Sequence, residues 1–189
     1  MRIIPLKFEK KYNCNMFIGK GLLADIDSCL VPILPGKKAV IITNPFVREL
    51  FGDKIVDLIS KKDILTHIIE VPDGEKSKSL SIAEKVYDQL LQFKADRSTT
   101  LITLGGGVIG DLGGFVAATF MRGIPLIHIP TTLLAQIDSS IGGKTAIDHP
   151  KAKNIIGSFY QPIANIVDTE ALGSLPISHL KNGITEAIK

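Results

Sequence analysis

Short apolar runs rich in β-branched residues alternate with segments of helical spacing, and this alternation constrains the fold more than any other feature. The runs are Lys38–Thr43, Leu65–Val71, Thr99–Leu104 and Ile124–Ile129. Turn-forming residues end each run, and a helical pattern follows. Strands that alternate with helices of this length form parallel pairs, and helices then cover both faces of the sheet. The sequence therefore predicts a Rossmann-like α/β fold with an open, mostly parallel sheet.

The segments before and between these runs predict further elements. Two short extended segments, IIPLKF at 3–8 and CNMFIG at 14–19, are typical of edge strands or a hairpin. Ser81, followed three residues later by Glu84, matches a capping box. The sequence therefore predicts N-terminal edge strands, and a helix that begins near Ser81.

The C-terminal part of the chain has a different texture. Residues 142–162 are rich in Gly, Lys, Asn and Pro and predict a long functional loop or irregular segment. Ile163–Asp168 predicts one more short strand, and Ile177–Lys189 predicts the opening of a helix. We therefore expect an α/β domain over 1–175 and the beginning of a second domain over 176–189.

Composition and charge exclude several classes of protein. The 189 residues suffice for one well-buried domain, and 45% hydrophobic with 22% charged residues is ordinary for a soluble globular protein. A net charge of +3 with scattered lysines does not indicate a nucleic-acid partner. No apolar run suits a membrane span, and the N-terminus lacks the apolar core of a signal peptide. Cys14 and Cys29 have no metal-type spacing, so we expect a reduced, cytoplasmic protein with no membrane partner.

The strongest sign of function is a G-x-G-x-x-G motif at Gly105, Gly107 and Gly110, between a predicted strand and a predicted helix. Glycine lets the backbone approach a pyrophosphate, and the free N–H groups at a helix start attract the anion. The structural alternative is a tight turn with close helix–sheet packing, which Gly113-Gly114 also suits. The usual fingerprint has an acidic residue about 20 positions later, which is lacking here. The ribose and base must therefore be held from elsewhere.

A polar turn, Pro72-Asp73-Gly74-Glu75-Lys76-Ser77-Lys78, follows the second apolar run. Open α/β sheets bind ligands at the carboxyl ends of their strands. Asp73 or Glu75 could accept ribose hydroxyls, and Lys78 could meet a charged group. A solvated polar turn explains the same residues equally well.

Residues further along the chain also suit an anionic ligand. Thr131 or Thr132 would cap a helix, and either hydroxyl could reach a phosphate. The GGKT sequence that ends at Thr145 is not a Walker A loop, because the first glycine of that motif is missing. Lys144 beside two glycines, together with Lys153-Asn154, could still place two cations and an amide on one anion. Exposed loop lysines are the alternative.

The charged end of the chain and the histidines give no complete metal site. Glu186 and Lys189 share one helix face at i and i+3, and a surface ion pair explains them from the sequence alone. The four histidines show none of the spacings typical of metal ligands. His67 and His128 lie in strand runs and are expected to be satisfied core or sheet residues.

These residues resemble a known family. The string GGGVIGDLGGFVAATFMRGIPLIHIPTTLLAQIDSSIGGKTAIDHPKAKNIIGSFYQP closely resembles the signature of 3-dehydroquinate synthase, as do DGEKSK and the ending NGITEAIK. The resemblance covers Lys38 to Lys189. It implies a shikimate-pathway lyase that uses NAD and a divalent metal, zinc or cobalt, to convert the sugar phosphate 3-deoxy-arabino-heptulosonate 7-phosphate to 3-dehydroquinate with loss of phosphate.

The resemblance also assigns roles to individual residues. Those similar to NAD ligands of the family are Asn44, Asp73, Gly74, Glu75, Lys76, Ser77, Lys78, Gly106, Gly107, Val108, Ile109, Gly110, Asp111, Thr131, Thr132, Lys144 and Lys153. Those similar to its substrate and catalytic residues are Asp138, Lys144, Asn154 and Lys189, with Glu186 as one metal ligand. Arg122 resembles an arginine that reaches the substrate phosphate of a partner subunit, which implies a homodimer.

The sequence departs from the family pattern in several places. Asp148 stands where the family usually has Asn, Ala152 where it often has Gly, and His179 where an acidic residue is more usual. The family's other two metal ligands are histidines of a C-terminal helical domain that is missing here. We therefore expect the chain alone to bind NAD weakly and to show no synthase turnover.

Three alternative functions remain open. One is another sugar-phosphate cyclase of the 2-deoxy-scyllo-inosose or valiolone type, which shares the cofactor chemistry. Another is a nucleotide-binding module without activity of its own. An iron- or zinc-dependent alcohol dehydrogenase also uses a GGG turn for NAD, but the DSSIGGKTA segment argues against it.

Overall fold

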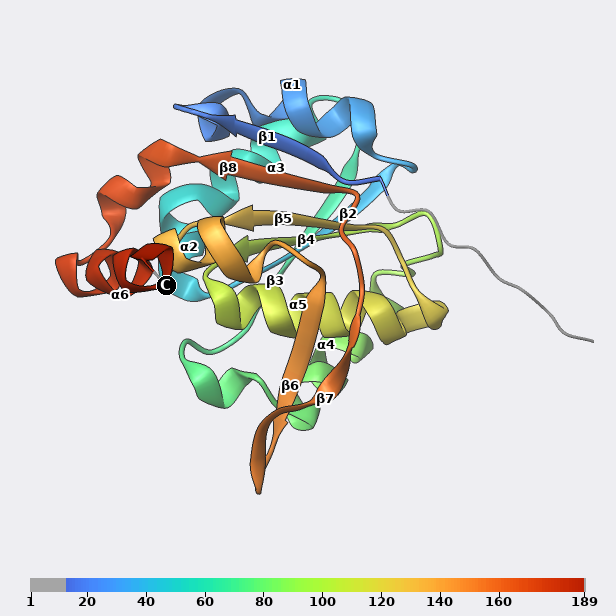
Figure 1. Cartoon of the computed structure of the whole chain (residues 1–189). Coiled ribbons are helices and arrows are strands. Elements are labelled where there is room, and N and C mark those ends of the chain that lie inside the picture. The colour runs from blue at the N-terminus through green and yellow to red at the C-terminus, as the bar shows by residue number, and fades with distance from the viewer. Residues whose placement is uncertain (1–12, 189) are drawn as a thin grey trace, which may run out of the picture.

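The computed structural model describes residues 13–188, whose centre is a six-stranded parallel sheet (Figure 1). The strand order is β1-β8-β5-β4-β2-β3, and every neighbouring pair is parallel. The strands are β1 (Asn15–Gly19), β2 (Lys38–Thr43), β3 (Leu65–Glu70), β4 (Thr100–Gly105), β5 (Leu126–Pro130) and β8 (Ala164–Asp168). The predicted Rossmann-like α/β fold with a mostly parallel sheet is confirmed.

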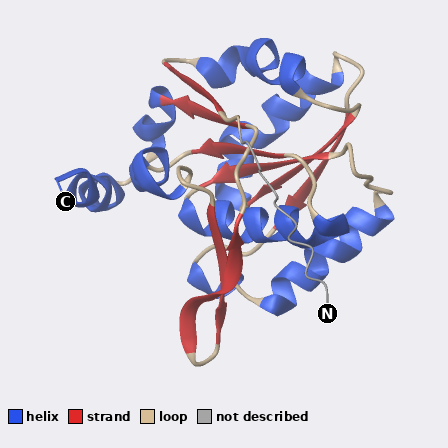
Figure 2. Cartoon of the chain, turned by 45° about the vertical axis from the view of Figure 1, so that its right-hand side comes forward, coloured by secondary structure: helices blue, strands red, loops and turns tan. Residues whose placement is uncertain are grey.

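Helices cover both faces of this sheet (Figures 1 and 2). One face carries α1 (Ile26–Leu30) and α3 (Asp53–Ser60), and the other carries α4 (Leu80–Gln92) and α5 (Gly107–Thr119). Shorter elements include α2 (Pro45–Val47), which runs through the π-helix η3 (Arg48–Gly52) into α3. They also include the 3-10 turns η4 (Glu75–Ser77), η5 (Phe120–Arg122) and η7 (Thr169–Ser174), and the π-helix η6 (Ala135–Ser139). A last helix, α6 (Ile177–Ile188), confirms the helix predicted there.

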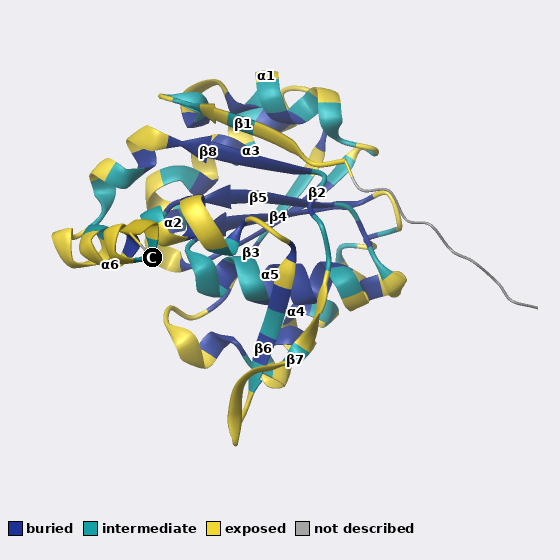
Figure 3. Cartoon of the chain, viewed as in Figure 1, coloured by how far each residue is buried: buried dark blue, intermediate teal, exposed yellow. Residues whose placement is uncertain are grey.

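The central strands are apolar on both sides because both sides are covered. On β2, Val40 and Ile42 pack with α4 and α5, whereas Ala39 and Ile41 pack with α1 and α3. All six residues of β4 are buried, and Figure 3 shows the middle of the sheet as the most buried part of the chain. Within the described residues, no helix is long and apolar enough to cross a membrane.

The order of the strands creates a switch point between β2 and β4. From β2 the chain goes outward to the edge strand β3, and it returns through α4 to β4 on the other side of β2. The connections that leave the carboxyl ends of β2 and β4 therefore diverge, which opens a crevice at this edge of the sheet. Asn44 and Gly106 follow these two strands directly.

The predicted long loop over 142–162 is wrong, because this segment forms a hairpin of β6 (Lys144–His149) and β7 (Ala152–Phe159). Thr145 and Ile147 alternate with less buried residues on β6, and both are buried against α5. The approach is close: a Cβ on Gly114 of α5 would lie 2.4 Å from Thr145 Cγ2. One face of β6 therefore packs on α5, and the tip of the hairpin extends away from the parallel sheet (Figure 2).

Two further predictions concern the N-terminal strands and the start of helix α4. CNMFIG forms the edge strand β1, paired in parallel with β8, whereas IIPLKF lies outside the described residues. The predicted capping box at Ser81 is wrong, because Ser81 lies inside helix α4. Helix α4 begins two residues earlier, where the Ser79 hydroxyl accepts a hydrogen bond from the N–H of Ile82. Leu80 is exposed, so the apolar pattern does not mark the true start.

Candidate functional site

The glycine-rich turn forms the floor of a cleft of about 440 Å³ at the switch point of the sheet. Gly106 is the N-cap residue of α5 and makes no side-chain capping bond, so the first N–H groups of the helix remain for a ligand. A Cβ on Gly106 would lie 3.0 Å from Thr132 Cγ2, and one on Gly107 would lie 3.2 Å from Ser139 Oγ. Glycine therefore lets the turn pack close to these two side chains, and the free N–H groups of the helix start are what suit a diphosphate.

The opposite wall of the cleft is built on the residues that follow β2 and β3. Asn44 Oδ1 accepts a hydrogen bond from Val47 N at 2.8 Å and so caps α2. Its Nδ2 donates to Asp73 Oδ1, also at 2.8 Å. Asp73 and Gly74 are exposed and line the cleft. The chain thus fixes one carboxylate across from the glycine turn, where it can accept hydroxyl groups.

The loop after β5 closes the cleft from the side. Thr131 N donates to Gly105 O at 3.0 Å, which ties this loop to the glycine turn. The Thr132 hydroxyl accepts from Ala135 N at 3.3 Å, so of the two threonines predicted as the cap, Thr132 caps the following helical segment. His179 and Asn182 of α6 also line the cleft. Sequence reasoning left His179 unexplained and missed Asn182, since nothing in the local pattern indicates which face of α6 meets the glycine turn.

The predicted turn 73–78 does not act as one unit. Its first two residues line the cleft at the glycine turn, but Ser77 is buried and donates its hydroxyl to Pro72 O, closing the turn. Lys76 is exposed and does not line this cleft. Glu75 lies 3.8 Å from Lys78 Nζ and 3.7 Å from Lys153 Nζ.

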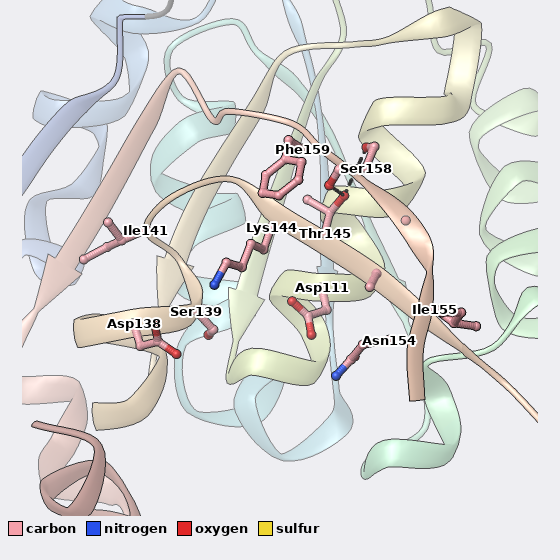
Figure 4. Close-up of a pocket in the computed structure, with 12 residues that line it drawn as sticks. Asp111, Asp138, Ser139, Ile141, Lys144, Thr145, Asn154, Ile155, Ser158 and Phe159 are labelled. Carbon is pink, nitrogen blue, oxygen red and sulfur yellow. Dashed lines mark hydrogen bonds between the residues drawn. The ribbon is translucent and has the colours of Figure 1, made fainter. Parts of the chain in front are cut away.

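A second cavity, of about 470 Å³, lies on the other side of the glycine turn (Figure 4). Its polar lining includes Asp111, Asp138, Lys144 and Asn154. In Figure 4 the Lys144 side chain extends into the cavity between the two aspartates. Elements far apart in sequence meet here: the second turn of α5, the π-helix η6, and both strands of the hairpin. Two carboxylates, an ammonium and an amide are suited to a ligand with hydroxyl groups and negative charge.

Asn154 owes its position to an uncommon backbone conformation. Its φ is +55°, in the left-handed region, and its N–H donates to Asp148 Oδ1 at 2.7 Å. An asparagine at 148, usual in the family that the sequence resembles, offers the same acceptor oxygen. The neighbouring Lys153 is 76% exposed and lies near Glu75, away from Lys144. The structure therefore brings Lys144 and Asn154 together but leaves Lys153 outside this cavity.

Burial changes the pKa of two groups near the glycine turn. Burial raises the pKa of Asp111, although the Lys78 ammonium, which donates a 2.7 Å hydrogen bond to its carboxylate, opposes this. Burial lowers the pKa of His128 to about 4, so this ring is neutral at pH 7. His128 Nδ1 lies 2.6 Å from Thr103 Oγ1, which confirms the prediction of a satisfied core histidine.

Two further predicted site residues, Arg122 and Glu186, line neither cavity. Arg122 is exposed, with φ of +67°, in the turn between α5 and β5, at the amino end of the strands and opposite the glycine turn. Glu186 lies on α6, close to the C-terminal end. Among residues 13–188, no three His, Cys, Asp or Glu side chains are grouped to hold a metal ion. Lys189 lies outside the described residues.

Comparison with known proteins agrees with this geometry. A family model described as 3-dehydroquinate synthase N-terminal matches residues 68–182. The chain belongs to the 3-dehydroquinate synthase N-terminal family. The matched part contains the glycine turn, the hairpin and His179, whereas Asn44 and Glu186 lie outside it.

Relatives of this 3-dehydroquinate synthase family member extend the comparison. The 3-dehydroquinate synthase of Nitrosomonas europaea is 50% identical over 175 residues, which cover 93% of this chain and 47% of the relative. The chain spans about half the length of the curated relatives it matches.

Two solved structures of sugar-phosphate cyclases share the fold. A 2-deoxy-scyllo-inosose synthase complexed with carbaglucose-6-phosphate, NAD+ and Co2+ has a TM-score of 0.84 and 28% identity, over 94% of this chain and 50% of that one. The 2-epi-5-epi-valiolone synthase of Streptomyces hygroscopicus, with NAD+ and Zn2+ bound, has a TM-score of 0.85 and 29% identity, over 98% of this chain and 50% of that one.

Proposed function

We propose that this chain is the NAD-binding part of a 3-dehydroquinate synthase, which converts 3-deoxy-arabino-heptulosonate 7-phosphate to 3-dehydroquinate with release of phosphate. The observation that carries the proposal is the uncapped start of α5 at Gly106 and Gly107, at the switch point of a parallel sheet. Identity of 50% to a 3-dehydroquinate synthase, against 28% and 29% to two other cyclases, favours this substrate over theirs.

The nucleotide cleft offers groups that match NAD. The diphosphate would lie over the N–H groups of Gly107 and Val108, where the helix dipole favours negative charge. Asp73, oriented by Asn44, is placed to accept hydrogen bonds from a ribose. Bound NAD supplies a hydride acceptor and later a hydride donor. The chain's own contribution is to hold the dinucleotide beside the second cavity.

The second cavity is proposed to take the sugar phosphate. Lys144 supplies a positive charge to an anionic substrate, and the amide of Asn154 supplies a hydrogen-bond donor or acceptor. Asp138 can accept hydrogen bonds from substrate hydroxyls. Gly107 lines the nucleotide cleft and Ser139 lines this cavity, so ligands in the two spaces would approach each other near these residues.

The remaining assignments are also part of the proposal. Glu186 is proposed as one ligand of a divalent metal, zinc or cobalt, and Lys189 as a substrate contact. The described residues do not complete a metal site by themselves. Arg122 is exposed and remote from the cavity of its own chain, which is compatible with reaching the substrate phosphate of a partner in a homodimer. The cytoplasmic location expected from the sequence stays a prediction.

Calorimetric titration of the chain with NAD tests the nucleotide assignment. We expect saturable binding by the wild-type chain and at least about a tenfold loss in Gly107→Val, whose side chain fills the space beside Ser139. Gly173→Ala is the matched control, because a Cβ there meets no atom within 4 Å. Equal NAD affinity in the wild type and Gly107→Val would place the nucleotide elsewhere or show that it does not bind.

Turnover assays with different sugar phosphates test the substrate assignment. The chain alone is expected to show no synthase turnover. In the full-length protein, we expect release of phosphate from 3-deoxy-arabino-heptulosonate 7-phosphate and not from glucose 6-phosphate or sedoheptulose 7-phosphate. Preference for either of the other two would replace this function with that of another cyclase.

A further inference from the structure

The side chain of Lys78 lies in an environment that its position in the sequence does not indicate. Lys78 ends the turn whose first residues line the nucleotide cleft, and the family resemblance groups it with the NAD ligands. Its side chain is only 4% exposed, and its ammonium donates hydrogen bonds to Asp111 Oδ2, at 2.7 Å, and to Asn154 Oδ1. Both acceptors line the 470 Å³ cavity, whereas Lys78 itself lines neither cavity and acts on this one only through them.

The main chain of Lys78 makes a second connection to the same region. Its carbonyl oxygen accepts a hydrogen bond from Asp148 N at 2.8 Å. The Asp148 carboxylate in turn accepts from Asn154 N at 2.7 Å, and Asn154 has the left-handed φ of +55°. Lys78 therefore holds the β6–β7 hairpin through its backbone and through its side chain.

The charges around Asp111 explain why an ammonium is needed at this point. Glu75 and Asp148 are both close enough to oppose ionisation of Asp111, and burial opposes it as well. Lys78 supplies the compensating charge and pairs with the Asp111 carboxylate. The same ammonium fixes the amide of Asn154, since Oδ1 accepts from Lys78 and Nδ2 is left for another partner.

We infer that Lys78 is a positioning residue of the substrate cavity, which holds Asp111 and Asn154 in place for the sugar phosphate and anchors the hairpin that carries Lys144. The inference rests on the proposed function for the identity of the ligand. It moves Lys78 from the nucleotide to the substrate side of the glycine turn. If Lys78 contacts the nucleotide, removal of its ammonium weakens NAD binding. If it positions Asp111 and Asn154, removal weakens binding of the sugar phosphate instead.

The test compares Lys78→Met, which keeps the length but loses the charge, with Lys78→Arg, which keeps the charge. Lys85→Met on α4 is the control, since Lys85 is an exposed lysine outside both cavities. NAD affinity is measured by calorimetry, and affinity for 3-deoxy-arabino-heptulosonate 7-phosphate is measured with NAD at saturation. We expect Lys78→Met to weaken sugar-phosphate binding by at least about tenfold and NAD binding by less than about threefold. Lys78→Arg should recover part of the loss.

Two readouts do not depend on the identity of either ligand. In Lys78→Met, hydrogen exchange of amides in β6 and β7 should rise by at least about tenfold relative to Lys85→Met. Carbon NMR titration of the Asp111 carboxyl should show its pKa moving upward in Lys78→Met and staying near the wild-type value in Lys78→Arg, an effect that a purely steric role would not produce.

The outcomes separate the inference from the proposed function. A loss of NAD affinity equal to the loss of sugar-phosphate affinity, with hairpin exchange unchanged, would make Lys78 a nucleotide ligand and overturn the inference. If the wild-type chain binds neither ligand, the proposed function fails, while the exchange and NMR results still decide the positioning role. If Lys78→Met does not fold, Lys78→Gln and Lys78→Arg are compared by the same measurements, and equal hairpin exchange in both overturns the inference.

Discussion

His128 Nδ1 lies 2.6 Å from Thr103 Oγ1, and this buried pair sits directly beneath the glycine-rich turn. The two residues are register partners on β5 and β4, so their side chains share one face of the sheet. A Cβ on Gly110 would lie 4.0 Å from the His128 ring, which shows how closely the turn rests on it. The ring is neutral, because burial lowers its pKa to about 4.

The first prediction is that His128 makes the fold less stable in acid. Its pKa falls from the ordinary value of 6.5 to about 4 on folding, so the unfolded chain binds the proton more tightly. Stability is therefore highest above pH 6.5, where the ring is neutral in both states, and it falls as the pH drops from 6.5 toward 4. At pH 5, this effect of His128 should lower the free energy of unfolding by about 2 kcal/mol relative to pH 7.5.

Urea unfolding at several pH values measures this contribution. His128→Gln keeps a hydrogen-bonding side chain but cannot be protonated, so its unfolding free energy should fall less between pH 7.5 and 5 than that of the wild type. His67→Gln is the control, since His67 lies on the edge strand β3 and is only partly buried. An identical pH dependence in His128→Gln and the wild type would contradict the assignment.

The second prediction separates glycines that pack from glycines that bind. A Cβ on Gly113 would lie 2.3 Å from Thr103 Cγ2, in the contact between α5 and β4. Gly113→Ala should therefore cost about 1–3 kcal/mol of stability by overpacking. The glycine turn itself is not altered, so NAD affinity of the folded variant should stay near that of the wild type.

A second substitution checks the mechanism of that loss. Thr103→Ser removes the methyl group that the new Cβ would meet and keeps the hydroxyl near His128. In a double-mutant cycle measured by urea unfolding, Thr103→Ser should recover part of the stability lost in Gly113→Ala. Additive losses would mean that the clash lies elsewhere.

The parallel sheet and its ligand edge could be predicted from sequence because the signal is local. The β-branched runs alternate with helical segments, and a parallel sheet buried on both faces needs such runs. The glycine motif after Leu104 was predictable for the same reason, because strand, turn and helix follow one another in the chain. A single stretch of sequence contained all the information that was needed.

The hairpin and the environment of Lys78 were not predictable in this way. On β6 only Thr145 and Ile147 are buried, a pattern too short to outweigh the Gly, Lys and Pro of the surrounding segment 142–162. Lys78 meets Asp111 and Asn154, which are 33 and 76 positions away, only because α5 and the hairpin pack together. Contacts of that kind depend on the tertiary arrangement, and no local motif encodes them.

The third prediction concerns Asn44, which has two roles at the nucleotide cleft. Asn44→Ala removes the helix cap and should lower stability by about 1 kcal/mol. Asn44→Asp keeps the capping oxygen but replaces the donor to Asp73 by a second carboxylate. We expect Asn44→Asp to retain most of the stability while NAD affinity falls in both variants. Unfolding curves and NAD titrations measure the two effects, and unchanged NAD affinity in Asn44→Asp would remove Asp73 from the proposed ribose site.

The fourth prediction is that Asp168 anchors the edge of the sheet. This residue is 3% exposed, and its carboxylate accepts hydrogen bonds from three backbone N–H groups: Gly21 at 2.8 Å, Leu23 at 2.9 Å and Glu170 at 2.9 Å. The first two follow β1, so the carboxylate joins the chain after β1 to the end of β8. Asp168→Ala leaves all three donors without this acceptor.

We expect Asp168→Ala to lower the free energy of unfolding by about 2–4 kcal/mol, because a buried donor without an acceptor costs about 1–3 kcal/mol. Glu170→Gln is the control: its ion pair with Lys20 spans 3.5 Å between exposed side chains, so its loss should cost less than about 1 kcal/mol. Hydrogen exchange should also increase in β1 more than in β4, because only β1 depends on this anchor at the sheet edge. Equal stability in the two variants, with β1 still protected, would show that pairing with β8 alone holds the edge strand.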